Sequence, residues 1–257
     1  MTNTSMVSFY KDAKDMAYKG FMYLPKGTNS SSEGVKFFDA LFYGVPVAVE
    51  NGLKVVDMAT WEKFISGFSD KEIHDLAFEK VLFKGVAFKK FLFACGFKDV
   101  IFECCTFEND FLNCRFQSCT FNKGVFGKAG IRMCRVDKCT FMECDLSHST
   151  IDCDMDGCLF TNCTFSQANI YSSLIMLSSF VRCDFSYAYL RRDNFYKTKM
   201  SSPNFLAATI NGTRFDASEI TDANYESISI TMGGATSEEI DNLKSHVLRA
   251  FTPVLTM

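Results

Sequence analysis

The residues of this chain best suited to chemistry are its twelve cysteines. Cysteines at close spacing form disulfides in secreted proteins and bind zinc or iron–sulfur clusters in cytosolic ones. The Cys-x-x-Cys pair that is typical of such metal sites is absent here. We therefore expect free thiols, without disulfides and without a bound metal.

A second candidate is the acidic run Asp152-Cys-Asp154-Met-Asp156-Gly157, which matches the first half of a calcium-binding loop. Such a loop needs a bidentate carboxylate at its twelfth position, and Cys163 stands there instead. We interpret the three aspartates as solvated surface groups that bind no calcium.

Catalytic groups are scarce. The three histidines, His74, His148 and His246, fall in separate parts of the chain, and we place His74 in an N-terminal helix. Cys104 is the one cysteine expected to face solvent, as an incidental surface thiol. The chain contains neither a phosphate-binding loop nor a dinucleotide-binding fingerprint. We therefore expect no catalytic residue, no cofactor and no metal.

The elements that carry these residues follow from a repeat of five. Steps of five residues from Phe78 to Ile230, with three steps of four, pass through 32 positions that are all apolar or aromatic. We place the steps of four at Phe93–Phe97, Phe107–Phe111 and Ile151–Met155. A period of five fits neither a flat strand nor a helix, but a chain that turns by about 90° every five residues keeps all large residues inside.

The position two residues before each large residue holds a small side chain. Eleven of the twelve cysteines fall there, and Ala, Ser and Thr fill most of the rest. Cysteine acts in this position as a small hydrophobe. We expect one inner column to contain Phe121, Phe141, Phe160 and Phe180, beside Cys119, Cys139 and Cys158.

This pattern resembles the pentapeptide-repeat family, whose consensus is A-(D/N)-L-x-x. Residues 139–143 (CTFME), 163–167 (CTFSQ), 168–172 (ANIYS) and 188–192 (AYLRR) carry the resemblance, which covers about 60% of the chain. It implies a mainly β protein, a right-handed quadrilateral parallel β-helix with four repeats per coil and about eight coils in all. We assign this β-helix to residues 76–232.

A solenoid of parallel coils needs a cap at each end. For residues 1–75 we predict a small mixed α/β cap module, with a hairpin turn at 50–52 and a short helix at 61–65. Ser69 and Glu72 have the spacing of a capping box, which predicts a second helix just before the first coil.

For residues 233–257 we predict a capping helix and tail. Gly233-Gly234 ends the β-helix, and Thr236 with Glu239 forms a further capping box. The helix that follows has one apolar face, which we expect to lie across the last coil. A homodimer through this helix is an open alternative.

Composition limits the partners. The net charge is −3, whereas nucleic-acid binders show a basic excess, so we expect no direct binding of nucleic acid. We find no stretch that would span a membrane and no signal peptide, and expect a cytoplasmic protein, or one in the host cytoplasm if it is exported as an effector.

The function we predict is that of a non-catalytic interaction protein that presents rigid β-helix faces to a protein partner. The repeat turns several large side chains outward together, which is typical of an interface. The alternative for this patch is packing against a terminal segment that folds back. Its members are Tyr171, Leu174, Met176, Leu177, Tyr187, Tyr189 and Tyr196.

Two other functions stay open. The resemblance implies that some relatives mimic DNA and inhibit a DNA-handling enzyme, such as gyrase, another topoisomerase or a restriction system. That role requires an acidic face, and 17 basic and 17 acidic residues between Phe78 and Ile230 leave no net charge there. The second alternative is a secreted bacterial effector.

Overall fold

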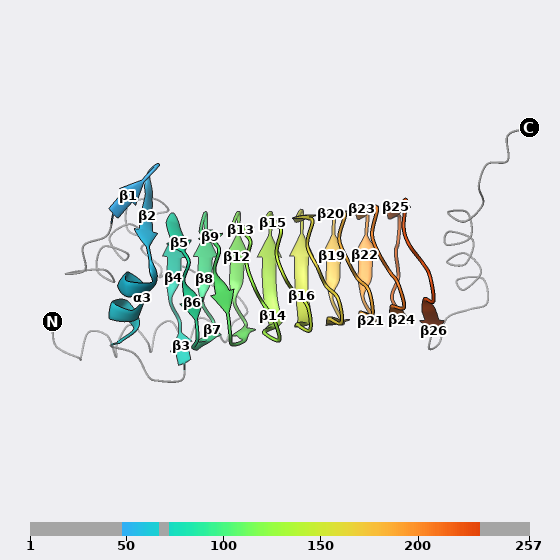
Figure 1. The fold of residues 1–257 in the computed structure, drawn as a ribbon, viewed down its shortest axis with the longest axis horizontal. Helices are drawn as coiled ribbons and strands as arrows, with labels where there is room; N and C mark the ends of the chain where they lie inside the picture. The colour runs from blue at the N-terminus through green and yellow to red at the C-terminus, as the bar shows by residue number, and fades with distance from the viewer. Residues whose placement is uncertain (1–47, 67–71, 232–257) are drawn as a thin grey trace, which may run out of the picture.

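The repeat folds into a parallel β-solenoid of about eight coils (Figure 1), as the five-residue period predicts. The structure is a computed structural model and describes residues 48–66 and 72–231 of the 257-residue chain. The predicted C-terminal helix and the homodimer through it lie outside the described residues. Among those residues, no helix is long and apolar enough to cross a membrane.

Each coil has four faces, which we number by the inward residue of one coil: Ile170 for face 1, Ile175 for face 2, Phe180 for face 3 and Phe185 for face 4. Equivalent residues of neighbouring coils are 19 or 20 positions apart and pair in parallel, as Phe121 does with Phe102 and with Phe141.

Faces 1 and 2 belong to one 14-stranded sheet, because β14 and β16 run through the corner between them. Face 1 contains β3 (Glu72–His74), β7 (Phe91–Phe93), β11 (Phe111–Leu112), the first part of β14 (Gly130–Asp137) and of β16 (Thr150–Asp156), β18 (Asn169–Tyr171), β21 (Tyr189–Arg191), β24 (Thr209–Asn211) and β26 (Ser229–Thr231). Face 2 contains β4 (Ala77–Glu79), β8 (Gly96–Lys98), β12 (Arg115–Gln117), the rest of β14 and β16, β19 (Leu174–Met176) and β22 (Asn194–Tyr196).

Face 3 is formed by eight strands of the 10-stranded sheet, whose other two strands belong to the N-terminal cap, and face 4 is held mostly by single bridges between coils. The strands of face 3 are β5 (Val81–Lys84), β9 (Ile101–Glu103), β13 (Thr120–Asn122), β15 (Thr140–Met142), β17 (Leu159–Thr161), β20 (Ser179–Val181), β23 (Lys199–Ser201) and β25 (Glu219–Thr221). Face 4 has β6 (Ala87–Phe88) and β10 (Thr106–Phe107), which pair with each other.

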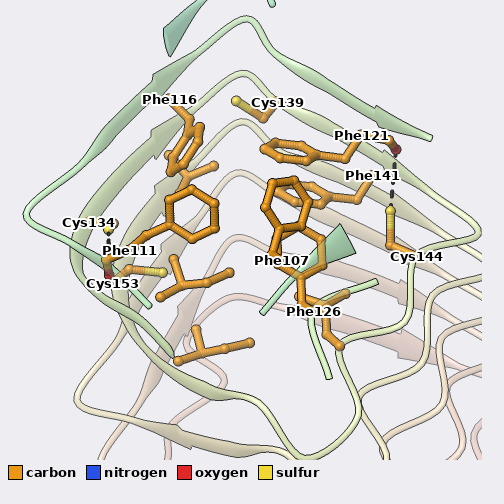
Figure 2. Close-up of a cluster of buried hydrophobic side chains, with 14 of the residues drawn as sticks. Phe107, Phe111, Phe116, Phe121, Phe126, Cys134, Cys139, Phe141, Cys144 and Cys153 are labelled. Atoms are coloured by element: carbon orange, nitrogen blue, oxygen red, sulfur yellow. Dashed lines mark hydrogen bonds between the residues drawn. The ribbon is translucent and has the colours of Figure 1, made fainter. Parts of the chain in front are cut away.

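Aromatic rings stack in columns along the inside of the solenoid (Figure 2). On face 3 the rings of Phe121 and Phe141 lie 4.5 Å apart at an interplanar angle of 3°, and the ring of Phe160 follows 4.5 Å from that of Phe141. The next step, to Phe180, is 4.6 Å. The repeat thus places one large side chain per coil in each column, and each ring covers the ring of the preceding coil.

The corners are made by residues in the left-handed conformation. The residue two positions after an inward residue usually has a positive φ, for example 52° at Lys138, 50° at Leu177 and 58° at Tyr187. Non-glycine residues rarely adopt this conformation, because their Cβ approaches the following carbonyl oxygen. The solenoid imposes it on them at almost every corner.

One of the steps of four lies elsewhere than the sequence pattern predicts. Leu92, which is 1% exposed, takes the inward position on face 1 and pairs with Phe111, whereas Phe93 points outward with Phe91. The step of four therefore falls between Phe88 and Leu92. Three consecutive apolar residues allow either frame, and a shift of one residue exchanges the inner and outer sides of a strand.

The N-terminal cap contains the predicted hairpin and the predicted short helix. Strands β1 (Ala48–Glu50) and β2 (Leu53–Val56) pair antiparallel around Asn51 and Gly52, whose φ values are 51° and 77°. Helix α3 (Met58–Ile65) begins at Asp57, whose carboxylate accepts a hydrogen bond of 2.8 Å from the backbone N–H of Thr60.

This cap covers the first coil. The Trp61 ring lies 5.5 Å from Phe83 and 4.8 Å from Phe88, and β2 pairs in parallel with β5. The second predicted helix is wrong at Glu72 and His74, which lie in strand β3; Ser69 lies outside the described residues. The capping-box spacing misled because Ile73 belongs to the inward column of face 1 and pairs with Leu92.

Candidate interaction surface

The interior of the solenoid contains the eleven repeat cysteines as free thiols, each at most 3% exposed. Cys104 is exposed at a corner with a φ of 52°. Burial raises the pKa of Cys105 to about 12 and that of Cys158 to about 11. A reactive cysteine needs access to solvent as well as a lowered pKa, and none of the eleven has that access. The geometry therefore favours a structural role for these thiols.

Their role includes hydrogen bonds that the sequence pattern did not reveal. The side chain at the small inward position accepts a hydrogen bond from the backbone N–H of the equivalent residue in the preceding coil. Cys119 N–H donates to the Cys139 sulfur at 3.3 Å, and later along the column Cys158 N–H donates to the Ser178 hydroxyl at 3.1 Å. Several thiols also donate to a carbonyl, as Cys144 does to Phe121 at 3.4 Å (Figure 2).

One member of these columns is a carboxylic acid. Asp193, which is 1% exposed, accepts a 3.0 Å hydrogen bond from the backbone N–H of Ser173 and a 3.3 Å bond from the Thr213 hydroxyl. Burial raises its pKa to about 6. The carboxyl group occupies a position that elsewhere holds Cys, Ser or Thr, so its hydrogen bonds explain its presence inside the solenoid.

The remaining candidates for chemistry do not converge. Asp152 lies on face 1 and pairs with Arg132, whereas Asp154 and Asp156 lie on face 2. Among the described residues no three ligand-type side chains are grouped to bind a metal. His74 contacts Asp75 at 3.1 Å in β3, His148 lies at a corner with a φ of 59°, and His246 is outside the described ranges.

The seven residues singled out as an outward patch lie on faces 1 and 2 and at the two corners that bound this pair of faces, on two neighbouring coils. We call them the apolar patch. Four are exposed: Leu177 (61%), Tyr189 (59%), Tyr187 (52%) and Tyr196 (37%). Tyr171, Leu174 and Met176 are half-buried.

Strand pairing sets the order of side chains within the apolar patch. On face 2 Met176 of β19 lies between Asp156 of β16 and Tyr196 of β22. On face 1 Tyr171 of β18 pairs with Arg191 of β21. Strands β16, β19 and β22 are neighbours on the side of the solenoid turned to the viewer in Figure 1.

Two members of the patch occupy corners, where the solenoid imposes a left-handed conformation that their own side chains do not favour. Leu177 and Tyr187 are exposed corner residues with φ values of 50° and 58°. Asn or Gly adopts this conformation more readily, and neither side chain is buried in return. Because almost every corner shares this φ, what sets these two residues apart is a large side chain left in water beside the other members of the patch.

Cations border the patch and were missed by the sequence pattern. The guanidinium carbon of Arg191 lies 5.7 Å from the ring centre of Tyr171, and the Lys197 amine lies 5.2 Å from that of Tyr196. Arg192 follows at the corner between faces 1 and 2. The alternation of tyrosines with Arg191-Arg192 and Lys197 in the sequence is the signal that would have revealed them.

Charge is nearly balanced on every face between Glu72 and Thr231. Face 3 illustrates this: Lys84 pairs with Glu103 at 3.9 Å, and pairs at 3.8 Å join Lys123 to Glu143 and Lys199 to Glu219 on neighbouring coils. The charged residues of face 2 are Lys80, Lys98, Arg115, Arg135, Lys138, Lys197 and Arg214, against Glu79, Asp99, Asp137, Asp154, Asp156 and Asp216.

No family model and no curated protein matches this sequence. Among solved structures, the chain overlaps with full-length QnrB1, a plasmid-mediated fluoroquinolone resistance protein, at 12% identity and a TM-score of 0.40, over 68% of this chain and 99% of that one. It also overlaps with HetL, a pentapeptide repeat protein involved in heterocyst differentiation regulation from the cyanobacterium Nostoc, at 9% identity and a TM-score of 0.29, over 64% of this chain and 88% of that one.

The repeat and the coil of this chain establish its fold without reference to those similar structures. Four units, mostly of five residues, complete one coil, and each coil pairs in parallel with the next. Each unit turns one small and one large side chain inward, as between Cys139 and Phe141. The chain is therefore a pentapeptide-repeat β-solenoid.

Proposed function

We propose that this chain is a non-catalytic interaction protein and that the apolar patch is its interface for a protein partner. The observation that carries the proposal is the exposure of Leu177 and Tyr187 next to the other apolar and aromatic side chains of the patch. Each side chain disfavours its own backbone conformation and leaves apolar surface in water, so neither stabilises the fold. A partner that covers them explains their presence.

The chemistry of the surrounding residues supports a protein as the partner. Tyr and Arg are enriched at protein interfaces and dominate their binding energy. The patch combines four tyrosines with Arg191 and Arg192, and the rigid stack of coils holds them in place, so little order is lost on binding. The balanced charge of each face argues against DNA mimicry, which requires an acidic face.

Capture by the full-length chain tests this function. The wild-type chain, a Leu177→Asn/Tyr187→Asn variant and a Met133→Asn control are immobilised, and proteins retained from an extract of the native host are identified and then purified for direct binding. Met133 is a matched control because it is 71% exposed at a corner with a φ of 52°, outside the patch.

We expect at least one protein to bind the wild type and the control directly, with affinity for the double variant reduced at least about tenfold. All three chains should unfold at similar temperatures. Equal retention of every partner by the three chains would refute the assignment of the interface to this patch.

A further inference from the structure

Face 2 carries three different kinds of side chain in order along three neighbouring strands. Strand β16 presents Asp154 and Asp156. Strand β19 presents Leu174 and Met176, and Leu177 is the corner residue that follows it. Strand β22 has Arg192 at the corner before it and Lys197 at the corner after it. Parallel strands are spaced about 4.8 Å apart, so the acidic and basic groups lie about 10 Å apart, on either side of the apolar row.

The lateral order of these groups also matches. Asp154 precedes the inward Met155, and Arg192 precedes the inward Phe195, so both lie toward the corner with face 1. Asp156 and Lys197 follow the same two inward residues and lie toward face 3. Each acidic group therefore has a basic counterpart on the same side of the face, two coils away, at the corner next to Asn194 or Tyr196, the residues in register with it.

These four charged groups are not used within the chain. Among the described residues, none of Asp154, Asp156, Arg192 and Lys197 forms a salt bridge, although other cations of the same face do, such as Arg115 with Asp137 at 3.2 Å. Lys197 lies over its neighbour Tyr196 at 5.2 Å, which leaves its charge unpaired. An arrangement of acid, apolar row and base along one face is complementary to itself when one copy is reversed.

We infer that a second copy of this chain docks antiparallel on face 2, with a two-fold axis at Met176. The inference rests on the proposed function and names the partner of the face 2 part of the apolar patch. Each copy places its apolar row against the row of the other. Asp154 and Asp156 of one copy then come within reach of the Arg192 and Lys197 side chains at the corners of the other, twice per dimer.

The size of the contact predicts how the dimer behaves. One face of a four-sided solenoid is narrow, so the contact is at the small end of specific interfaces, and we expect a reversible dimer that forms as concentration rises. Tyr171 and Tyr189 of face 1, and Tyr187 at the corner between faces 4 and 1, stay outside the contact. Salt should weaken the dimer, because charged pairs at the rim are screened.

Charge exchange on the full-length chain tests the inference by sedimentation velocity over a range of concentrations. One variant carries Asp154→Lys/Asp156→Lys and the other carries Arg192→Glu/Lys197→Glu. In each variant all charges that flank the apolar row have the same sign, so like charges meet in its homodimer. In a mixture, the new lysines of the first variant face the new glutamates of the second. The native Arg192 and Lys197 of the first variant face the native Asp154 and Asp156 of the second.

We expect the wild type to dimerise, each variant alone to dissociate at least about tenfold more readily, and an equimolar mixture to regain the wild-type behaviour. A Lys128→Glu/Arg182→Glu control changes the net charge equally at corners of faces 4 and 3 and should dimerise as the wild type does.

Wild type that stays monomeric at every concentration would overturn the second copy as partner, as would a mixture no more associated than its components. Neither outcome affects a different protein that is retained through Leu177 and Tyr187, so the failure of the dimer and the failure of the proposed function are distinguishable.

Discussion

The small inward residues of the solenoid differ in chemistry between its earlier and its later coils. In the earlier coils the small inward residue is mostly cysteine, as at Cys114 and Cys134. In the later coils of the same column it becomes Ser173, Asp193 and Thr213. The backbone is the same in both regions, since equivalent strands pair in parallel throughout.

Sulfur and oxygen side chains in this column accept the same hydrogen bond from a backbone N–H. Cys114 N–H donates to the Cys134 sulfur at 3.4 Å, and Ser173 N–H donates to the Asp193 carboxylate at 3.0 Å. Sulfur accepts weakly but fills apolar volume, whereas oxygen accepts strongly but needs all its hydrogen bonds satisfied when buried. This column therefore selects for a small side chain with a γ-atom that accepts a hydrogen bond, and it tolerates either sulfur or oxygen there.

The largest effect should come from the aromatic core of the earlier coils. Phe141→Ala should lower the free energy of unfolding by about 3–5 kcal/mol, because the stacked rings of Phe121 and Phe160 cannot close the cavity. Urea denaturation measures the loss. Ile220→Ala is the matched change in the last coil of the same face; because Ile220 is only half-buried, its loss should be smaller. Equal losses would show that the two regions are packed alike.

The buried carboxyl group of Asp193, in the later coils, should make the free energy of unfolding depend on pH. The folded-state pKa of Asp193, about 6, exceeds its ordinary value of 3.8. Protonation therefore favours the folded state: the contribution of Asp193 is fully present below about pH 4 and is lost as pH rises through 6, by roughly 2–3 kcal/mol. Unfolding free energies at several pH values measure it.

Asp193→Ser supplies the control for this titration, because Ser occupies the equivalent position at Ser173. The difference in unfolding free energy between wild type and variant should shift in favour of the variant as pH rises. A difference that is constant across the same range would mean that folding leaves the pKa of Asp193 unchanged.

The four-sided coil was predictable because the five-residue period is carried by two kinds of residue at once, large ones and small ones. The step of four near Phe93 was placed wrongly, because Phe91, Leu92 and Phe93 are all apolar and only the pairing of Leu92 with Phe111 decides the frame. Ser69 and Glu72 had the spacing of a helix start, yet the pairing of β3 with β7 overrides local preference.

The candidate surface was predictable in part. The repeat register placed Leu174, Met176 and Tyr196 outward, because the two sides of a strand alternate. It did not reveal that Arg191 and Lys197 lie over tyrosine rings, since side-chain conformation decides those contacts. Nor did composition show that Asp193 is held by hydrogen bonds inside the coil.

The small inward positions that hold cysteine should tolerate the loss of the thiol. Cys144→Ala should lower the free energy of unfolding by less than about 1.5 kcal/mol, because it removes one atom and one weak hydrogen bond to the Phe121 carbonyl. Cys144→Leu is the contrasting change and should cost more than Cys144→Ala, since the closed corner has no room for it. A severe loss of folding with Cys144→Ala, or a metal bound by the wild type and lost in the variant, would contradict a space-filling role for the thiols.

The smallest effect is expected at the outer surface of the later coils. Leu177→Asn should change the free energy of unfolding by no more than about 0.5 kcal/mol, because Asn suits a φ of 50° and the leucine is 61% exposed. Ile175→Asn, two residues earlier and 1% exposed, should be severely destabilising by the same urea assay. If Leu177→Asn also destabilised the chain strongly, the leucine would be supporting the fold, and the case for a partner at this corner would fail. If only Ile175→Asn does, selection on Leu177 acts through what it contacts outside its own chain.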